Sequence, residues 1–188
     1  MARPDPGGRA NEAGSVYRAG VAAYLAAHGL AGVPVESLQA DGYPTRISLE
    51  TGAAVDDVRC EFSTGAVVDI QAKNGCGFDD AFRSVIAQWI DAASSDELEP
   101  IASVALVTRV ARGGLRDLGA ALKRRRETPL TRMLPAEDRA FARLDPLLIS
   151  LSDEQRERLL AKANVLELPV NDSGVFANEG WKLVGLTA

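Results

Sequence analysis

The residues best suited to chemistry lie in the stretch DIQAKNG, residues 69–75, where polar and apolar side chains alternate. Successive side chains of a strand point to opposite faces of the sheet, so Asp69, Gln71 and Lys73 share one face and the apolar residues between them share the other. An apolar face is typical of packing against a core. The sequence therefore predicts a strand with one face in the core and an acid, an amide and an amine on the other.

A hairpin would bring a further acid to this polar face. A second strand-like stretch, residues 58–62, precedes the first and is separated from it by STG, a typical hairpin connection. If STG is the loop, Asp57 lies across from Gln71 in the antiparallel pair. A two-residue loop would shift the pairing by one residue and favour Asp56 against Lys73. The alternation of apolar residues within 58–62 favours the three-residue loop.

A third strand is predicted over residues 45–50, with Ile47 and Leu49 toward the core and Glu50 toward the polar face. Glu36, in the loop before this strand, is the alternative to Glu50 as the second acid. Asp69 lies too far along its own strand and is expected to be structural. The expected site therefore consists of Glu50, Asp57, Gln71 and Lys73.

These residue types suit metal-assisted hydrolysis of a phosphodiester. Mg²⁺ prefers oxygen ligands, takes one or two carboxylates and keeps several waters. Asp57 and Glu50 would supply the carboxylates, and the Gln71 amide oxygen or the backbone carbonyl of Ala72 would be the neutral ligand. The ammonium of Lys73 would orient the attacking water and offset the charge that builds on the phosphate. Because the set holds no covalent nucleophile, direct attack by water is the expected mechanism.

The predicted elements place this site in an α/β fold. A helix over residues 15–30 precedes the three strands, and a helix over 78–93 and a buried strand over 102–108 follow them, which gives the order α-β-β-β-α-β. Three more helices are predicted over 115–126, 136–147 and 153–164, with VLELPV as a candidate final strand. The expected divisions are a flexible N-terminus (1–13), a core with a mixed sheet (14–130) and a helical extension packed on that core (131–188).

This arrangement resembles the PD-(D/E)xK nuclease superfamily. Asp57 followed by Gln71-x-Lys73 on the next strand is similar to the branch with Gln in the acidic position, as in Mrr-type restriction enzymes. The stretches GSVYRAGVAAYLAA, ISLETGAAVDDVRCEF, VVDIQAKNG and FRSVIAQWIDA resemble the N-terminal endonuclease domain of effectors in bacterial antiphage systems, both CBASS and signal-transduction ATPase systems. The resemblance covers about residues 14–130. The proline of the superfamily's name is absent, because Val55-Asp56 stands before Asp57.

The resemblance implies a restriction-endonuclease-like fold and a low-specificity endonuclease that cuts double-stranded DNA with Mg²⁺ or Mn²⁺. It also implies that Glu50, Asp57, Gln71 and Lys73 carry the metal and the catalysis. The expected partners are further copies of the chain, in a homo-oligomer, and a sensor or ATPase domain of a larger protein. The alternative function is an inactive nuclease-like fold that binds nucleic acid or serves assembly. A plainer alternative is an α/β domain whose polar strand face is solvated or internally paired.

Net charge qualifies the expectation of a nucleic-acid partner. The chain as a whole carries −5, which argues against phosphate contacts, but residues 109–132 hold eight basic residues and two acidic ones. Such a cluster is typical of a solvated helix face and also of a phosphate-binding flank. We expect Lys123, Arg124 and Arg125 within it to contact DNA.

The remaining composition indicates a cytoplasmic protein. The sequence contains no apolar run near the roughly 20 residues that span a bilayer, and it starts with a polar, Gly/Pro-rich stretch. No membrane partner is therefore expected. Cys60 falls in a strand and Cys76 in a Gly-rich turn, so two reduced thiols are expected rather than a disulfide.

Overall fold

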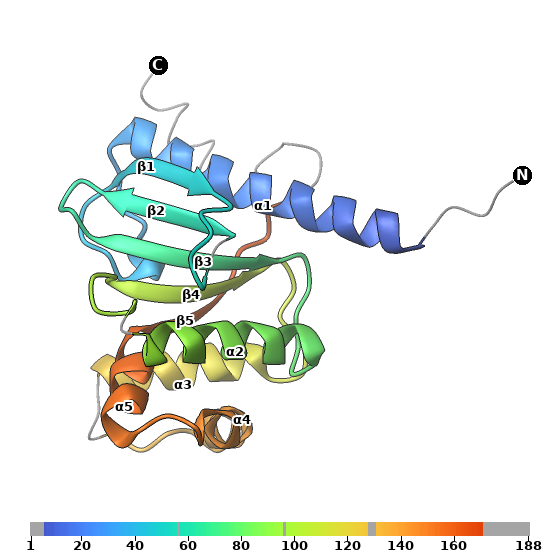
Figure 1. Ribbon diagram of the computed structural model, residues 1–188, viewed down its shortest axis with the longest axis vertical. Helices are drawn as coiled ribbons and strands as arrows, with labels where there is room; N and C mark the ends of the chain where they lie inside the picture. The colour runs from blue at the N-terminus through green and yellow to red at the C-terminus, as the bar shows by residue number, and fades with distance from the viewer. Residues whose placement is uncertain (1–5, 56, 96, 128–130, 171–188) are drawn as a thin grey trace, which may run out of the picture.

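One mixed β-sheet of five strands, in the order β1-β2-β3-β4-β5, forms the centre of the protein (Figure 1). The computed structural model describes residues 6–55, 57–95, 97–127 and 131–170. β1 pairs with β2 and β2 with β3 in antiparallel fashion, while β3 with β4 and β4 with β5 are parallel. In chain order the elements are α1 (Pro6–Ala31), the 3-10 helix η1 (Glu36–Leu38), β1 (Pro44–Leu49), β2 (Val58–Phe62), β3 (Val67–Lys73), α2 (Asp80–Ser94), β4 (Ser103–Thr108), α3 (Leu115–Glu127), α4 (Pro135–Leu144), the 3-10 helix η2 (Asp145–Leu148), α5 (Asp153–Lys162) and β5 (Ala163–Glu167).

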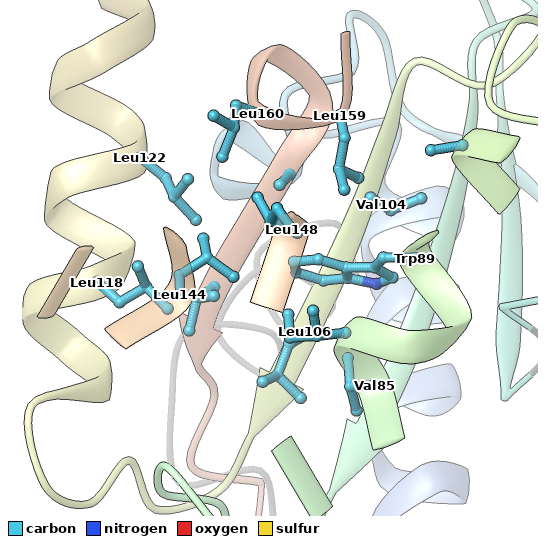
Figure 2. Close-up of a cluster of buried hydrophobic side chains, with 14 of the residues drawn as sticks. Val85, Trp89, Val104, Leu106, Leu118, Leu122, Leu144, Leu148, Leu159 and Leu160 are labelled. Carbon is cyan, nitrogen blue, oxygen red and sulfur yellow. The ribbon is translucent and has the colours of Figure 1, made fainter. Parts of the chain in front are cut away.

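Helices cover both faces of the sheet, which buries its parallel pairs on two sides. On one face, Tyr17, Val21 and Leu25 of α1 form a buried cluster with the apolar residues of β2 and β3. On the other face, Trp89 of α2 packs with β4 and with the helices that follow it. Figure 2 shows Trp89 beside Val104 and Leu106 of β4, with leucines of α3, η2 and α5 around them.

The alternation predicted for β3 is confirmed. Its even-numbered residues belong to the α1 cluster, so the odd-numbered ones face α2. The residue pairs between β2 and β3 run from Val58 opposite Ile70 to Glu61 opposite Val67. The loop is closed by a hydrogen bond from the Phe62 N–H to the Ala66 carbonyl at 2.8 Å, as the three-residue connection requires. Asp56, the residue favoured by the shorter loop, lies outside the described residues.

The chain after residue 131 contains helices and the final strand for which VLELPV was the candidate. This strand, β5, joins the sheet beside β4 and covers Ala163–Glu167, so it begins two residues before VLELPV, where a helix was expected to continue to Asn164. Pairing with β4 outweighs local helix propensity there. Leu144, Leu148 and Leu159 share one core with Trp89 (Figure 2), so the described part of this segment and the preceding core form one unit. Its last residues, 171–188, lie outside the described part.

Two element boundaries and the burial of one residue also differ from expectation. α1 begins at Pro6, inside the N-terminal stretch predicted to be flexible, of which only residues 1–5 lie outside the described part. α4 ends at Leu144 because Pro146 lacks the N–H that an α-helix needs, and a 3-10 turn follows. Leu49, expected in the core, is half exposed because it is the last residue of an edge strand. Among the described residues, no helix combines the length and apolar character needed to cross a membrane.

Candidate active site

The carboxylate of Asp57 is the centre of the candidate site. Its Oδ2 accepts the backbone N–H of Ala72 at 2.9 Å and lies 3.6 Å from Lys73 Nζ. Its Oδ1 lies 3.6 Å from the NH1 nitrogen of Arg18. The side chain is only 14% exposed, and these contacts fix its orientation.

The local fold explains this position. Asp57 directly precedes Val58, the first residue of β2, whose pair with Ile70 of β3 is the one farthest from the hairpin loop. Beyond this pair the two strands separate, and the N–H of Ala72 bonds to the Asp57 side chain instead of a backbone carbonyl of β2. The β2–β3 register, continued by one residue, puts Asp57 next to the Gln71–Ala72 segment, as the hairpin predicts, in the fork between β2 and β3.

Lys73 is the last residue of β3. Lys73 pairs with Thr108, the last residue of β4, and the Lys73 carbonyl accepts the N–H of Arg109 at 3.2 Å. The side chain is 30% exposed, so the ammonium contacts both Asp57 and solvent. Lys73 thus marks the carboxyl edge of the parallel strands, where ligands of α/β proteins commonly bind.

Gln71 supplies a buried acceptor without a partner. It is 3% exposed, and its Oε1 has no hydrogen bond to any group in the described part of the chain. A buried oxygen left unpaired costs roughly 1–3 kcal/mol. Such a cost is expected at a site that a cation or a water completes. Asp69, on the same face, is instead held by two hydrogen bonds of 2.7 Å from Arg59, which agrees with a structural role.

Glu50 reaches the site in a way that strand alternation did not predict. It follows the end of β1 in a left-handed backbone conformation, with φ 51°. Its N–H approaches the Asp57 carbonyl at 3.4 Å, and its Oε1 lies 2.8 Å from Arg18 NH1. Glu50 and Asp57 therefore share one guanidinium. Arg18 is a site residue that the sequence did not reveal.

The structure does not bring Glu36 to the site. Glu36 starts η1, whose Leu38 carbonyl accepts a hydrogen bond from Ser103, the first residue of β4. Lys73 pairs instead with Thr108, the last residue of β4. Glu36 therefore lies at the amino ends of the parallel strands, and the candidate site lies at their carboxyl ends.

Lys123, Arg124 and Arg125 also lie away from Asp57. They belong to the last turns of α3, where the neighbouring Arg126 donates to the carbonyl of Ala163, the first residue of β5. Arg124 makes hydrogen bonds of 2.7 and 3.0 Å to the carboxylate of Glu137, and Arg125 makes hydrogen bonds of 2.6 and 2.7 Å to that of Glu157. Lys123 lies 3.9 Å from Glu127. These cations neutralise acids at the amino edge of the parallel strands.

Other arginines gather at the carboxyl edge, and we call Arg109, Arg112 and Arg143 the basic edge. The Arg112 N–H bonds to the Cys76 carbonyl at 2.9 Å, and its guanidinium packs over Gly75, two residues after Lys73. Arg143 lies 4.1 Å from the centre of the Phe78 ring and bonds to the Gly113 carbonyl at 3.4 Å. Within the described ranges, none of the three forms an ion pair.

The donors present fit a hard divalent cation. In the described part of the chain, no three acids, histidines or cysteines cluster in the manner of a rich metal site. Mg²⁺, however, needs only one or two carboxylates and keeps its remaining waters. Asp57 and Glu50 provide two carboxylates, and the unpaired Gln71 Oε1 a neutral oxygen.

No family model matches the chain, and neither does any curated protein or solved structure. The site must therefore be judged on its own chemistry. In this α/β protein, an oriented carboxylate and an ammonium lie at the carboxyl edge of parallel strands, and Gln71 of the same strand carries an amide oxygen without a partner among the described residues.

Proposed function

We propose that the protein is a metal-dependent endonuclease that hydrolyses the phosphodiester bonds of double-stranded DNA, on a restriction-endonuclease-like fold. The observation that carries this proposal is the grouping around Asp57, whose Oδ2 lies 2.9 Å from the Ala72 nitrogen and 3.6 Å from Lys73 Nζ. Gln71, the residue before Ala72 on β3, carries a buried Oε1 that lacks a partner among the described residues. Gln-x-Lys on one strand and Asp on its neighbour are the residues of the Gln-bearing nuclease branch.

Mg²⁺ or Mn²⁺ would be held by Asp57, Glu50 and Gln71, and when bound would polarise the phosphate and lower the pKa of a bound water. Lys73 acts on the same reaction with its ammonium, which points into the fork from the end of β3. It orients the attacking water and stabilises the negative charge that develops on the phosphate oxygens. Ala72 holds the Asp57 carboxylate in place through its N–H.

The basic edge supports a polyanionic substrate. The backbone N–H of Arg109 bonds to the Lys73 carbonyl across the β3–β4 pair. Arg112 and Arg143 extend the positive charge from there toward α2 and α4. Arginines without a carboxylate partner are suited to bind successive phosphates of a duplex backbone. Contacts to phosphates carry no sequence information, which agrees with low-specificity cutting.

The biological role follows from the resemblance to antiphage effectors. Under this proposal the domain is a toxic effector in the cytoplasm, joined to a sensor or ATPase domain and switched on by homo-oligomerisation. An unregulated cutter of duplex DNA would damage the host, so activation by assembly fits this chemistry.

The test is incubation of the purified chain with supercoiled plasmid in Mg²⁺, in Mn²⁺ and in EDTA, over a range of protein concentrations. We expect nicked and linear products with either metal and none in EDTA. The Asp57→Asn and Lys73→Ala variants should bind the plasmid and leave it uncut. If all proteins bind DNA and none cuts at any concentration, the inactive nucleic-acid-binding fold is the correct function.

A further inference from the structure

The guanidinium of Arg18 lies between the two carboxylates of the candidate site. Its NH1 nitrogen is 2.8 Å from Glu50 Oε1 and 3.6 Å from Asp57 Oδ1. One positive charge thus faces two negative charges, at the place where carboxylates would bind a divalent cation. Without such a charge, Glu50 and Asp57 would repel each other across the fork.

The two oxygens of Asp57 have different partners. Oδ2 accepts the Ala72 N–H and faces Lys73. Oδ1 faces Arg18 at a distance longer than a hydrogen bond, so this contact is a charge attraction without a directed bond. Oδ1 is therefore the Asp57 oxygen that a metal ion would take up, and the Arg18 guanidinium occupies the approach to it.

We propose that Arg18 is a resident counter-ion of this site, which a divalent cation displaces when it binds Asp57 and Glu50. This inference rests on the proposed function. The guanidinium is weakly held, because Glu50 is 74% exposed and exposed ion pairs contribute only about 0.2–1 kcal/mol. A divalent ion brings twice the charge of a guanidinium to the same oxygens, which favours the exchange.

The helix that carries Arg18 stays in place during this exchange. Tyr17 is 1% exposed and its hydroxyl donates to the Leu168 carbonyl at 3.0 Å, and Val21 is buried on the same face of α1. The exchange therefore involves the Arg18 side chain, which is 22% exposed. Once released, its guanidinium stands at the mouth of the fork, where its fixed array of N–H donors is suited to bind a phosphate.

The experiment measures Mn²⁺ affinity directly, by electron paramagnetic resonance of the free ion, on the full chain without DNA. The proteins compared are the wild type, Arg18→Gln, Arg18→Lys, Asp57→Asn and Arg46→Gln. Arg46 is the matched control, since it is an exposed arginine of β1 that lies 3.4 Å from a carboxylate oxygen of Glu61. Circular dichroism verifies that each variant is folded.

We expect Arg18→Gln to bind Mn²⁺ up to about 5-fold more tightly than the wild type, because the competing ion pair of about 0.2–1 kcal/mol is gone. Arg18→Lys keeps the positive charge but loses the guanidinium that faces both carboxylates, so its Mn²⁺ affinity should lie between those of the wild type and Arg18→Gln. If Arg18→Gln fails to fold, Arg18→Lys tests the proposal. Arg46→Gln should match the wild type. Unchanged or weaker binding by both Arg18 variants, with binding still dependent on Asp57, overturns the counter-ion proposal alone. Mn²⁺ binding that ignores Asp57→Asn overturns the metal site and the counter-ion together.

Discussion

The Oδ2 of Asp57 accepts the backbone N–H of Ala72 at 2.9 Å, so a side chain that flanks β2 completes the hydrogen bonding of β3. Asp57 Oδ2 therefore contributes both to the fold and to the candidate site. The same oxygen lies 3.6 Å from Lys73 Nζ, and the other oxygen faces Arg18. Substitutions at Asp57 should therefore separate a structural effect from a chemical one.

Asp57→Asn should abolish cutting and leave stability nearly unchanged. The asparagine carbonyl still accepts the Ala72 N–H, while the negative charge toward the cation is lost, so we expect a fall in cleavage rate of roughly 10²-fold or more. Asp57→Ala also leaves the Ala72 N–H without its acceptor, which costs about 1–3 kcal/mol. Its melting temperature should fall by roughly 2–12 °C, measured by differential scanning calorimetry. Equal melting temperatures for the two variants would show that the hydrogen bond from Ala72 contributes nothing to stability.

Lys73→Ala tests whether the ammonium acts mainly on the transition state. Loss of one such group costs about 10² to 10³ in rate, and Lys73→Arg should restore little because a planar guanidinium does not occupy the position of a point charge. Melting should shift only slightly, since the pair with Asp57 is long and Lys73 is 30% exposed. Plasmid cleavage and thermal melting measure the two effects. A variant that melts several degrees lower and keeps its activity would make Lys73 a structural residue.

The DNA-docking surface is tested by the salt dependence of binding. Arg112→Gln with Arg143→Gln removes two exposed members of the basic edge, and each lost phosphate contact lowers the slope of log affinity against log salt by about 0.9. We expect a decrease of about 1–2 in that slope, measured by fluorescence anisotropy in the uncleaving Asp57→Asn background. Lys123→Gln with Arg125→Gln removes the same charge at the other edge and should leave the slope unchanged. A reversed result would place DNA at the end of α3, as the basic sequence cluster suggested.

The position of Asp57 opposite Gln71 could be predicted because both determinants are local. A three-residue connection sets the pairing of the hairpin, and the two-residue period of a strand decides which side chains share a face. Lys73 follows from the same period. Strand alternation does not account for the position of Glu50, because the residue follows the end of β1 and turns back through a positive φ.

Arg18 could not be predicted because its partners are distant in sequence and its own surroundings carry no signal. Only the packing of α1 against the sheet brings its guanidinium to Glu50 and Asp57. The pairing of Arg124 and Arg125 with acids, away from Asp57, has the same physical origin. Counting charges along a helix does not reveal that acids of α4 and α5 will lie opposite.

Acid should destabilise the protein through Glu137, the partner of Arg124. Glu137 is 3% exposed, and hydrogen bonds from the Arg124 guanidinium and the Leu134 N–H hold its pKa below the ordinary value of 4.5. A carboxyl with a lowered pKa in the native state stabilises the fold fully above its ordinary pKa, and this contribution is lost as the pH falls through the native value. The melting temperature of the wild type should therefore decrease below about pH 4.5.

Glu137→Gln isolates this contribution, because glutamine has no proton to take up. The variant should melt below the wild type at about pH 7, where the ion pair is intact, and its melting temperature should change less between about pH 5 and pH 3. Glu157→Gln is the matched control, since Glu157 also pairs with an arginine of α3 but is 64% exposed, and exposed pairs contribute little. Its acid profile should parallel that of the wild type. If Glu137→Gln keeps the full acid dependence of the wild type, the Arg124 and Glu137 pair does not link stability to pH, and Arg124 returns as a candidate for binding phosphate.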